Sequence, residues 1–319
     1  MGIKHLNKFL QDSCNESIKK IHLSSLSGKK IVIDTSIYLY RFIGDGCLLE
    51  NFYLMISIFR QYNIIPLFIF DGKPPKEKDE LLKQRKMEKR EAELKYKILE
   101  DKLINNIDDD INVVEIKGNM DVLKKQFIRV NHKDIENVKT LIKAYGVSYI
   151  EATGEADKLC AKMVCKHKAY ACLSEDMDLF VYGCGRVLRY LSLLKKTAIM
   201  YDLSGMLGEI KMTLQEFQQV TIVSGTDYNH DMKHNTNLMT TIKYFKRYKK
   251  GNSCEFYHWL KLNTNYVDNF DELNKIINMF SLVDMIEYKK YENIKIINGP
   301  LHISNLKMIM ANEHFVFVD

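Results

Sequence analysis

The sequence contains no close pair of cysteines. Its 319 residues include seven cysteines, an odd number, and none of them belongs to a Cys-x-x-Cys pair. This number and spacing argue against a disulfide framework and against a cysteine-based zinc site. We therefore expect a protein of a reducing, intracellular compartment, either the nucleus or the cytoplasm.

Long apolar runs are also missing. No stretch approaches the roughly 20 apolar residues of a membrane span. The opening residues, Met1 to Leu6, lack the apolar core of a signal peptide, and Leu6 stands where N-myristoylation needs Ser or Thr. We expect no membrane partner.

A strong excess of one charge is absent as well. The formal net charge is +6, which allows an acidic partner such as nucleic acid without requiring one. The apolar fraction of 46% is sufficient for a sizeable core. No repeat, low-complexity tract or obvious flexible linker divides the chain.

Aspartates follow three apolar, β-rich runs. The runs 30–33, 64–70 and 170–173 lead into Asp34, Asp71 and the pair Asp176 and Asp178. A capped turn explains any one of them, because acidic side chains often satisfy backbone donors after a strand. Turn chemistry does not require an aspartate after all three runs. Active sites of open α/β sheets lie at the carboxyl ends of strands, which is where these aspartates are expected.

Strand-like and helical segments alternate along the chain. Helical spacing is found at 48–62 and 132–145, and further strands are expected at 147–150, 187–191 and 197–201. The order predicts an α/β fold with a mainly parallel central sheet flanked by helices, and a helical C-terminal region.

A charged segment interrupts this alternation. From Lys76 to about Leu103, basic and acidic residues interleave and large apolar residues are few. The pattern predicts a long solvated helix, and an exposed salt-bridged helix without further function explains it equally well. The whole insert, 73–130, lies between two strands of the sheet.

Seven acidic residues stand at predicted strand ends and helix starts. They are Asp34, Asp71, Glu155, Asp157, Asp176, Asp178 and Asp227. If they converge, they cannot all ionise without cations. Oxygen donors without His or Cys at matching spacing favour Mg²⁺ or Mn²⁺ over zinc, and two such ions about 4 Å apart serve phosphodiester hydrolysis. Asp176 and Asp178 share one face only if the backbone between them is extended.

Six short motifs stand in order between Met1 and Tyr228. They are Met1-Gly2-Ile3, Ile33-Asp34-Thr35-Ser36-Ile37-Tyr38-Leu39-Tyr40, Phe70-Asp71-Gly72-Lys73-Pro74-Pro75, Glu155-Ala156-Asp157, Glu175-Asp176-Met177-Asp178 and Ser224-Gly225-Thr226-Asp227-Tyr228. Together they resemble the flap endonuclease family of structure-specific 5′ nucleases (XPG/Rad2-type). The resemblance implies a PIN-like 5′ nuclease fold and a two-metal enzyme that cuts DNA where a 5′ single-stranded flap joins duplex.

The resemblance also implies roles for single residues. It assigns one Mg²⁺ to Asp34, Asp71, Glu155 and Asp157, and the second Mg²⁺ to Asp176, Asp178 and Asp227. The insert 73–130 is similar to the helical arch of the family, and Lys78 and Arg85 fall at the offsets of its catalytic Lys and Arg. Contacts with DNA are expected for Gly2, Tyr40, Lys83, Lys246, Arg247, Lys249 and Lys250.

We accordingly expect a nuclease domain formed by 1–72 and 131–228, the arch insertion 73–130, and a mostly helical DNA-binding region at 229–319. The expected partner is DNA with a 5′ flap, nick or junction, bound by a monomer. The segment His234-Asn235-Thr236 stands where the family has a glycine turn, and no sliding-clamp peptide is recognisable. These departures are more like a divergent or viral member.

The sequence therefore predicts a Mg²⁺-dependent 5′ flap endonuclease with 5′ to 3′ exonuclease activity in DNA replication, repair or recombination. Asp157 stands where flap endonucleases usually have Glu, which resembles the related 5′-exonuclease branch and leaves a mainly exonucleolytic enzyme open. The residues are also compatible with a catalytically silent DNA-junction binder and with an RNA-directed nuclease.

Overall fold

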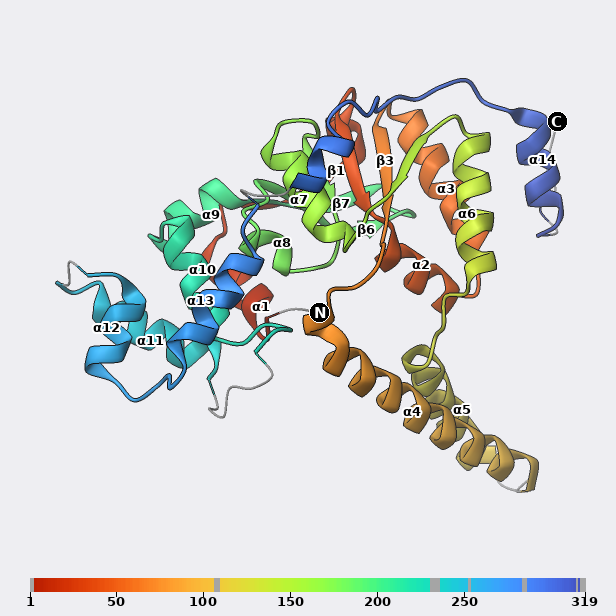
Figure 1. The fold of residues 1–319 in the computed structure, drawn as a ribbon. Coiled ribbons are helices and arrows are strands. Elements are labelled where there is room, and N and C mark those ends of the chain that lie inside the picture. The colour runs from red at the N-terminus through yellow and green to blue at the C-terminus, as the bar shows by residue number, and fades with distance from the viewer. Residues whose placement is uncertain are drawn as a thin grey trace.

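A seven-stranded sheet forms the centre of the molecule. The computed structural model describes residues 3–105, 110–229, 236–251, 254–282, 286–313 and 315. The strands are β1 (Ile18–His22), β2 (Lys30–Asp34), β3 (Ile65–Phe70), β4 (Ser148–Glu151), β5 (Ala171–Leu173), β6 (Arg186–Ser192) and β7 (Thr197–Asp202). Their order in the sheet is β1-β7-β6-β5-β2-β3-β4 (Figure 1).

The sheet is mainly parallel, as predicted. β6, β5, β2, β3 and β4 run in one direction, and β7 is antiparallel to its neighbours β6 and β1. β1 has no counterpart among the predicted strands. Its Lys19 and Lys20 are exposed at the edge of the sheet, so the apolar alternation that identifies a strand is weak there.

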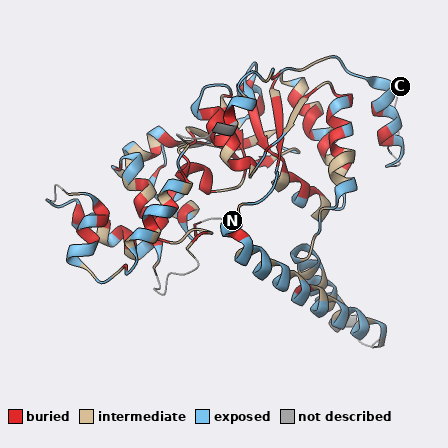
Figure 2. Cartoon of the chain, viewed as in Figure 1, coloured by how far each residue is buried: buried red, intermediate tan, exposed pale blue. Residues whose placement is uncertain are grey.

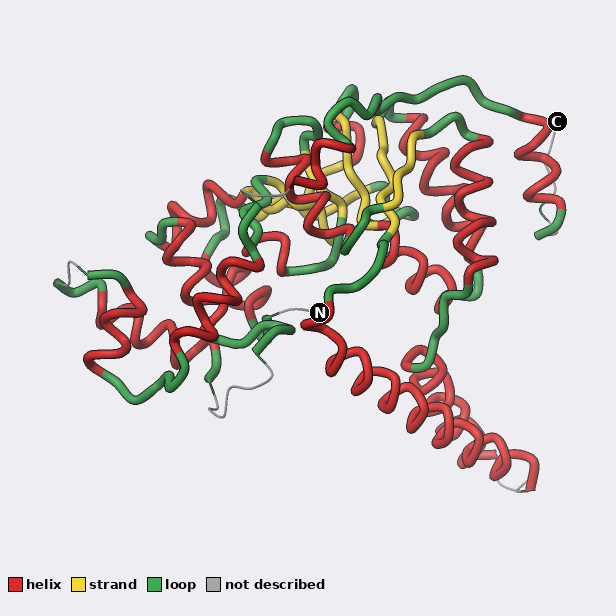
Figure 3. Tube along the Cα trace, in the orientation of Figure 1, coloured by secondary structure: helices red, strands yellow, loops and turns green. Residues whose placement is uncertain are grey.

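Helices cover both faces of the sheet (Figure 3). Alternate strand residues contribute to two separate cores. In β2, Ile31 and Ile33 belong to one core and Val32 to the other, as the period of two requires. The first core is covered by α2 (Thr35–Gly44), α3 (Leu48–Gln61), α6 (His132–Ala144) and α14 (Ile303–Ala311), with the 3₁₀ helix η1 (Leu23–Leu26). The second is covered by α1 (Leu6–Ser13), α7 (Ala156–Cys165), α8 (Asp178–Val181), α9 (Leu203–Ile210), α10 (Leu214–Val223), α11 (Leu238–Tyr248), α12 (Phe256–Asn263) and α13 (Phe270–Met279).

The charged insert forms an arm that projects from the body (Figure 1). We use the word arm for the 3₁₀ helix η2 (Lys76–Lys78), α4 (Asp79–Asn105) and α5 (Asp110–Gln126). The long α4 confirms the predicted solvated helix, since most of its residues are exposed (Figure 2). Glu93 of α4 pairs with Arg129 at 2.6 Å beyond the end of α5.

The segment after the 3₁₀ helix η3 (Ile286–Lys290) returns to the sheet and covers the edge of β4. Asn298 forms an antiparallel bridge with Val147, and Ser148 Oγ donates to the Lys295 carbonyl oxygen at 2.9 Å. α14 then packs against α6. In the described part of the chain, no helix has the length and apolar character needed to cross a bilayer.

We predict that Gly146→Ala destabilises the fold through this docked segment. Gly146 has φ +66°, and an added Cβ would lie 2.3 Å from the Pro300 carbonyl oxygen. Gly28→Ala is the matched control, because Gly28 has φ +71° and no atom within 4 Å of the added Cβ. Urea unfolding should show that Gly146→Ala lowers the free energy of unfolding by about 1–3 kcal/mol more than the control does. Equal losses in the two variants would mean that the contact with Pro300 is unimportant.

Candidate active site

Four neighbouring strands bring their carboxyl ends to one edge of the sheet. β5, β2, β3 and β4 are adjacent and parallel. Asp34 is the last residue of β2, Asp71 directly follows β3, and the loop after β4 leads to Glu155 at the start of α7. The strand order therefore places these acids at a common edge. We call the seven predicted acids, Asp34, Asp71, Glu155, Asp157, Asp176, Asp178 and Asp227, the acidic cluster.

A buried serine joins two members of the cluster. Ser174 Oγ donates to Asp34 Oδ2 at 2.9 Å and accepts from the backbone N–H of Asp176 at 3.1 Å. Burial raises the pKa of Asp34 well above its usual range, and the negative charges of Asp71, Asp157 and Asp176 raise it further. The side chain of Asp34 is therefore costly to ionise without a cation nearby.

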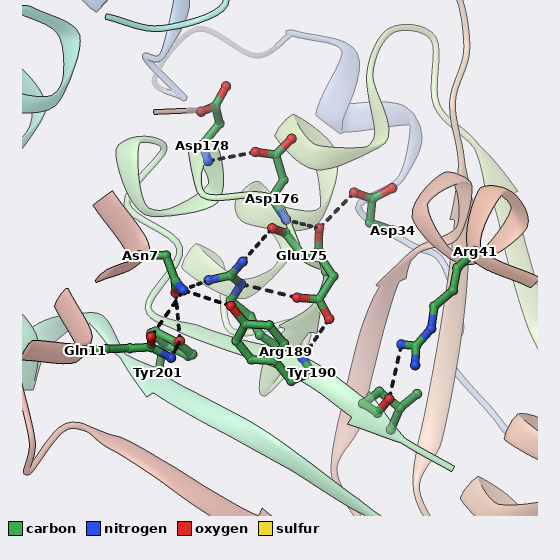
Figure 4. Close-up of polar contacts among 12 residues, drawn as sticks. Asn7, Gln11, Asp34, Arg41, Glu175, Asp176, Asp178, Arg189, Tyr190 and Tyr201 are labelled. Carbon is green, nitrogen blue, oxygen red and sulfur yellow. Dashed lines mark hydrogen bonds and ion pairs between the residues drawn. The ribbon is translucent and has the colours of Figure 1, made fainter. Parts of the chain in front are cut away.

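A short helix carries the next aspartate. Asp178 is the first residue of α8, and its backbone N–H donates to Asp176 Oδ1 at 3.0 Å (Figure 4). The backbone here is therefore helical at Met177 and Asp178, and the condition of an extended backbone between the two aspartates was wrong. The helical turn brings the pair together instead, through the bond from the Asp178 N–H.

The remaining members are placed by α7 and by a loop. Glu155 is the N-cap residue of α7 and Asp157 lies in its first turn, as expected. Asp71 Oδ1 accepts from the backbone N–H of Ala156 at 2.7 Å, which ties the end of β3 to the same helix. Asp227 lies in the loop that follows α10.

Acids of the cluster raise one another's pKa. Burial raises the pKa of Asp157 to about 8, with further contributions from Glu155 and Asp176. Burial also raises the pKa of Asp178, followed by the charges of Asp176, Asp227 and Asp157. Together with the effects on Asp34, these links connect all seven predicted acids.

Two cations of the arm reach into the cluster. Lys78 Nζ lies 2.6 Å from Glu155 Oε1, and Arg85 donates to Asp227 Oδ2 at 2.8 Å. Lys78 is only 8% exposed. Burial alone would lower the pKa of Lys78, but Tyr228, Asp157 and Glu155 beside it raise the pKa above its usual value.

Tyr228 completes this contact. Its hydroxyl donates to Glu155 Oε2 at 3.1 Å, and Lys78 Nζ lies 4.9 Å from the centre of its ring. Sequence analysis included Tyr228 only as the last residue of a motif, and it assigned no role to Tyr228 or to Ser174. Their position beside predicted acids was the one signal available, since the bonds to Asp34 and Glu155 join residues far apart in the sequence.

The donor set fits a hard divalent cation. The cluster offers only carboxylate oxygens, and Asp178 Oδ1 is buried with no hydrogen-bond partner among the described residues. Over the described ranges, no three His, Cys, Asp or Glu side chains form a ready group for a metal ion. Lys78 and Arg85 balance two of the carboxylates in this arrangement.

The residues expected to contact DNA lie in two places. Tyr40 of α2 is 45% exposed, and Lys89 Nζ of α4 lies 4.8 Å from the centre of its ring. Lys83 is exposed on α4. The basic run Lys246, Arg247, Lys249 and Lys250 lies at the C-terminal end of α11, which is on the opposite side of α1 from the arm in Figure 1.

Part of the charge of the basic run is balanced within the protein, because Lys249 Nζ pairs with Glu216 at 2.8 Å. Some other residues of the predicted DNA-binding surface are not described. Gly2, His234 and Asn235 lie outside the described residues, whereas Thr236 directly precedes Asn237, the N-cap residue of α11.

Comparison with known proteins finds XPG family models and flap endonucleases. The family model described as XPG N-terminal domain matches residues 1–92, and the model described as XPG I-region matches residues 146–227. Flap endonuclease 1 of Lodderomyces elongisporus is 30% identical over 253 residues, covering 73% of this chain and 62% of the relative. Flap endonuclease 1 of Danio rerio is 33% identical over 246 residues, covering 72% and 62%. The chain thus spans less than two thirds of the length of these two relatives.

Solved structures share the fold. The catalytic core of Rad2 has a TM-score of 0.64 at 17% identity, covering 98% of this chain and 95% of that chain. Human GEN1 in complex with Holliday junction DNA has a TM-score of 0.63 at 17% identity, covering 98% and 74%. Flap endonuclease-1 from Methanococcus jannaschii has a TM-score of 0.55 at 22% identity, covering 93% and 97%. These likenesses confirm the predicted fold class.

We predict that the acidic cluster makes the metal-free protein less stable as the pH rises. The pKa of Asp157 is about 8 in the folded protein against a usual 3.8, so the folded state binds more protons between these values and loses stability with increasing pH. Asp157→Asn removes this ionisation. In chelator, its melting temperature relative to wild type should rise by about 2–5 °C between pH 5 and pH 8.

The control is Asp12→Asn, on the exposed surface of α1, whose melting curve should follow that of the wild type. If Asp157→Asn also runs parallel to the wild type from pH 5 to pH 8, the raised pKa of Asp157 is refuted.

Proposed function

The chain belongs to the XPG/Rad2-type flap endonuclease family, and on this premise we propose that it is a structure-specific 5′ flap endonuclease with 5′ to 3′ exonuclease activity. It hydrolyses DNA phosphodiester bonds in replication, repair or recombination. The observation that carries the proposal is geometric: hydrogen bonds tie Asp34, Asp71, Asp176 and Asp178 at the carboxyl edge of the sheet, and Lys78 and Arg85 pair with Glu155 and Asp227 beside them.

The carboxyl groups are suited to hold Mg²⁺ or Mn²⁺. One ion would be held by Asp34, Asp71, Glu155 and Asp157, and a second by Asp176, Asp178 and Asp227. When bound, such ions supply an activated water and counter-charge for the leaving oxygen. The unpartnered Asp178 Oδ1 and the raised pKa values of Asp34, Asp157 and Asp178 support a cation at this place.

Lys78 and Arg85 bind the scissile phosphate and stabilise the charge that develops on it. Both stand at the base of the arm, and both already contact carboxylates of the cluster. A phosphate that enters between the arm and the cluster meets these two cations. We assign the arm, within the insert 73–130, the role of the arch through which the 5′ strand passes.

DNA with a 5′ flap, nick or junction is the proposed substrate, bound by a monomer inside the cell. Tyr40 offers an exposed ring for a base beside the scissile phosphate, and Lys83 and the basic run of α11 offer phosphate contacts. A silent DNA binder is disfavoured, because an acidic cluster of this size repels a phosphate backbone.

We predict that cleavage requires a divalent cation and the acidic cluster. End-labelled flap, nicked, gapped and blunt DNA and matched RNA should be incubated with Mg²⁺ and with chelator. Wild type should cut flap DNA with Mg²⁺ and fail with chelator, and Asp176→Asn should abolish cutting while flap binding stays within a few-fold. Cutting by Asp176→Asn at the wild-type rate would refute the assignment. The ratio of internal to terminal cuts decides between flap cutting and a mainly exonucleolytic enzyme.

We predict separately that Lys78→Ala and Arg85→Ala each lower the single-turnover cleavage rate at least about 100-fold, because each removes a cation from the scissile phosphate. Lys86→Ala, next to Arg85 on the exposed surface of α4, is the matched control and should stay within a few-fold of wild type. The same modest loss in all three variants would identify Lys78 and Arg85 as general phosphate binders.

A further inference from the structure

A buried arginine outside the acidic cluster contacts the loop that carries Asp176. Arg189 of β6 is only 5% exposed. Its Nη2 donates to the main-chain oxygen of Glu175 at 2.9 Å, and its Nε lies 3.6 Å from Glu175 Oε2. Its Nη1 donates to Asn7 Oδ1 (Figure 4). One guanidinium group therefore joins the loop after β5 to helix α1.

The strand that carries Arg189 is shaped for this contact. Glu175 Oε1 accepts from the backbone N–H of Tyr190 at 2.6 Å. Tyr190 has φ +53°, and the register of β6 with β7 shifts between Arg189 and Ser192. A non-glycine residue in the left-handed region is held there only by its surroundings. The irregular backbone turns the Tyr190 N–H toward the carboxylate of Glu175.

Helix α1 is bound to the same group. Asn7 Oδ1 also accepts from the Tyr201 hydroxyl at 2.9 Å, and Asn7 Nδ2 donates to the Tyr190 hydroxyl at 2.8 Å. The centres of the Tyr190 and Tyr201 rings lie 4.9 and 5.4 Å from Arg189 Cζ. The guanidinium donates through Nη1 and Nη2 in one plane, a fork geometry that the compact ammonium of a lysine does not reproduce.

The contact with the Glu175 main chain leads directly to the acidic cluster. Arg189 fixes the carbonyl of the peptide bond that joins Glu175 to Asp176, and the N–H of that same peptide donates to Ser174 Oγ. Ser174 Oγ in turn donates to Asp34 Oδ2. Hydrogen bonds on both sides of this peptide unit thus link Arg189, through the backbone of Asp176 and the hydroxyl of Ser174, to the Asp34 carboxylate at the end of β2.

The pair also removes an unwanted charge. Glu175 stands between Ser174 and Asp176 in the sequence, yet its carboxylate is directed to Arg189 and to the Tyr190 N–H (Figure 4). Arg189 balances that carboxylate, so Glu175 does not add a further uncompensated negative charge beside the acidic cluster.

We infer that Arg189 is a positioning residue for divalent-metal binding: held by Glu175 and Asn7, it sets the 174–176 loop and with it the separation of the Asp34 and Asp176 carboxylates. The inference rests on the proposed function, because it takes Asp34 and Asp176 as metal ligands. Groups that orient metal ligands without touching the metal typically contribute 10–100-fold to metal affinity.

The test compares Arg189→Met and Arg189→Lys with wild type. Mn²⁺ binding is measured by electron paramagnetic resonance without DNA, and the Mn²⁺ and Mg²⁺ dependence of flap cleavage is measured in parallel. Arg189→Met should weaken Mn²⁺ binding and raise the metal concentration for half-maximal cleavage about tenfold, with KM for flap DNA within twofold at saturating metal. Arg189→Lys, which keeps the charge, should recover part of the affinity.

Arg60→Met is the matched control. Arg60 of α3 also donates to two main-chain oxygens, those of Tyr145 at 2.8 Å and Gly299 at 3.1 Å, but Tyr145 and the buried apolar residues of α3 belong to the other core. It should lower the melting temperature without changing Mn²⁺ affinity. Glu175→Gln, which loses the carboxylate charge but preserves an acceptor for the Tyr190 N–H, should weaken Mn²⁺ binding less than Arg189→Met, and it serves as the test if Arg189→Met does not fold.

The outcomes separate the two proposals. A wild-type protein that neither binds Mn²⁺ nor cleaves DNA refutes the proposed function before any variant is made. A wild type that does both, together with Arg189 and Glu175 variants whose Mn²⁺ affinity equals that of wild type, overturns the role of Arg189 alone. A change in Mn²⁺ affinity equal to that of Arg60→Met would show a merely structural effect and would also overturn it.

Discussion

Repulsion among carboxyl groups at one edge of the sheet is the constraint on which the rest of this structure depends. Burial makes the ionised forms of Asp34, Asp157 and Asp178 costly, and each of these acids lies near other acids of the cluster. The protein offsets the charge with hydrogen bonds from Ser174 and from the backbone of α7, and with the two cations of the arm. The carboxyl ends of parallel strands meet at one edge of the sheet, so the acids that follow these strands lie close together.

This constraint explains why residues far apart in the sequence meet at the site. Helix α7 presents its N-terminus to the carboxylates, where unpaired N–H groups and the helix dipole favour negative charge. Asp71, which follows β3, accepts from the first N–H of that helix. Tyr228 and Lys78 arrive from the loop after α10 and from the arm, and both bind Glu155.

The strands that lead into aspartates could be predicted from the sequence, because an apolar run followed by an acid is a local pattern. β1 could not be found in this way, since two of its five residues are exposed lysines and its apolar positions are few. The helical turn at Asp178 was missed because four residues are too short for helical periodicity. Arg189 is an ordinary strand residue in the sequence, and its contacts with Glu175 and Asn7 span 14 and 182 residues. Only the folded structure shows these contacts of Arg189.

The two cations of the arm are not equivalent in this arrangement. The side chain of Lys78 is 10% exposed and that of Arg85 is 37% exposed. Solvent weakens the pair of Arg85 with Asp227, and exposed pairs of this kind contribute little to stability. Opening the pair of Lys78 with Glu155 would leave charges in a desolvated place, which is costly unless another cation or a phosphate replaces the lost partner. The pair of Arg85 therefore opens more readily than the pair of Lys78, although both cations come from the base of the same arm.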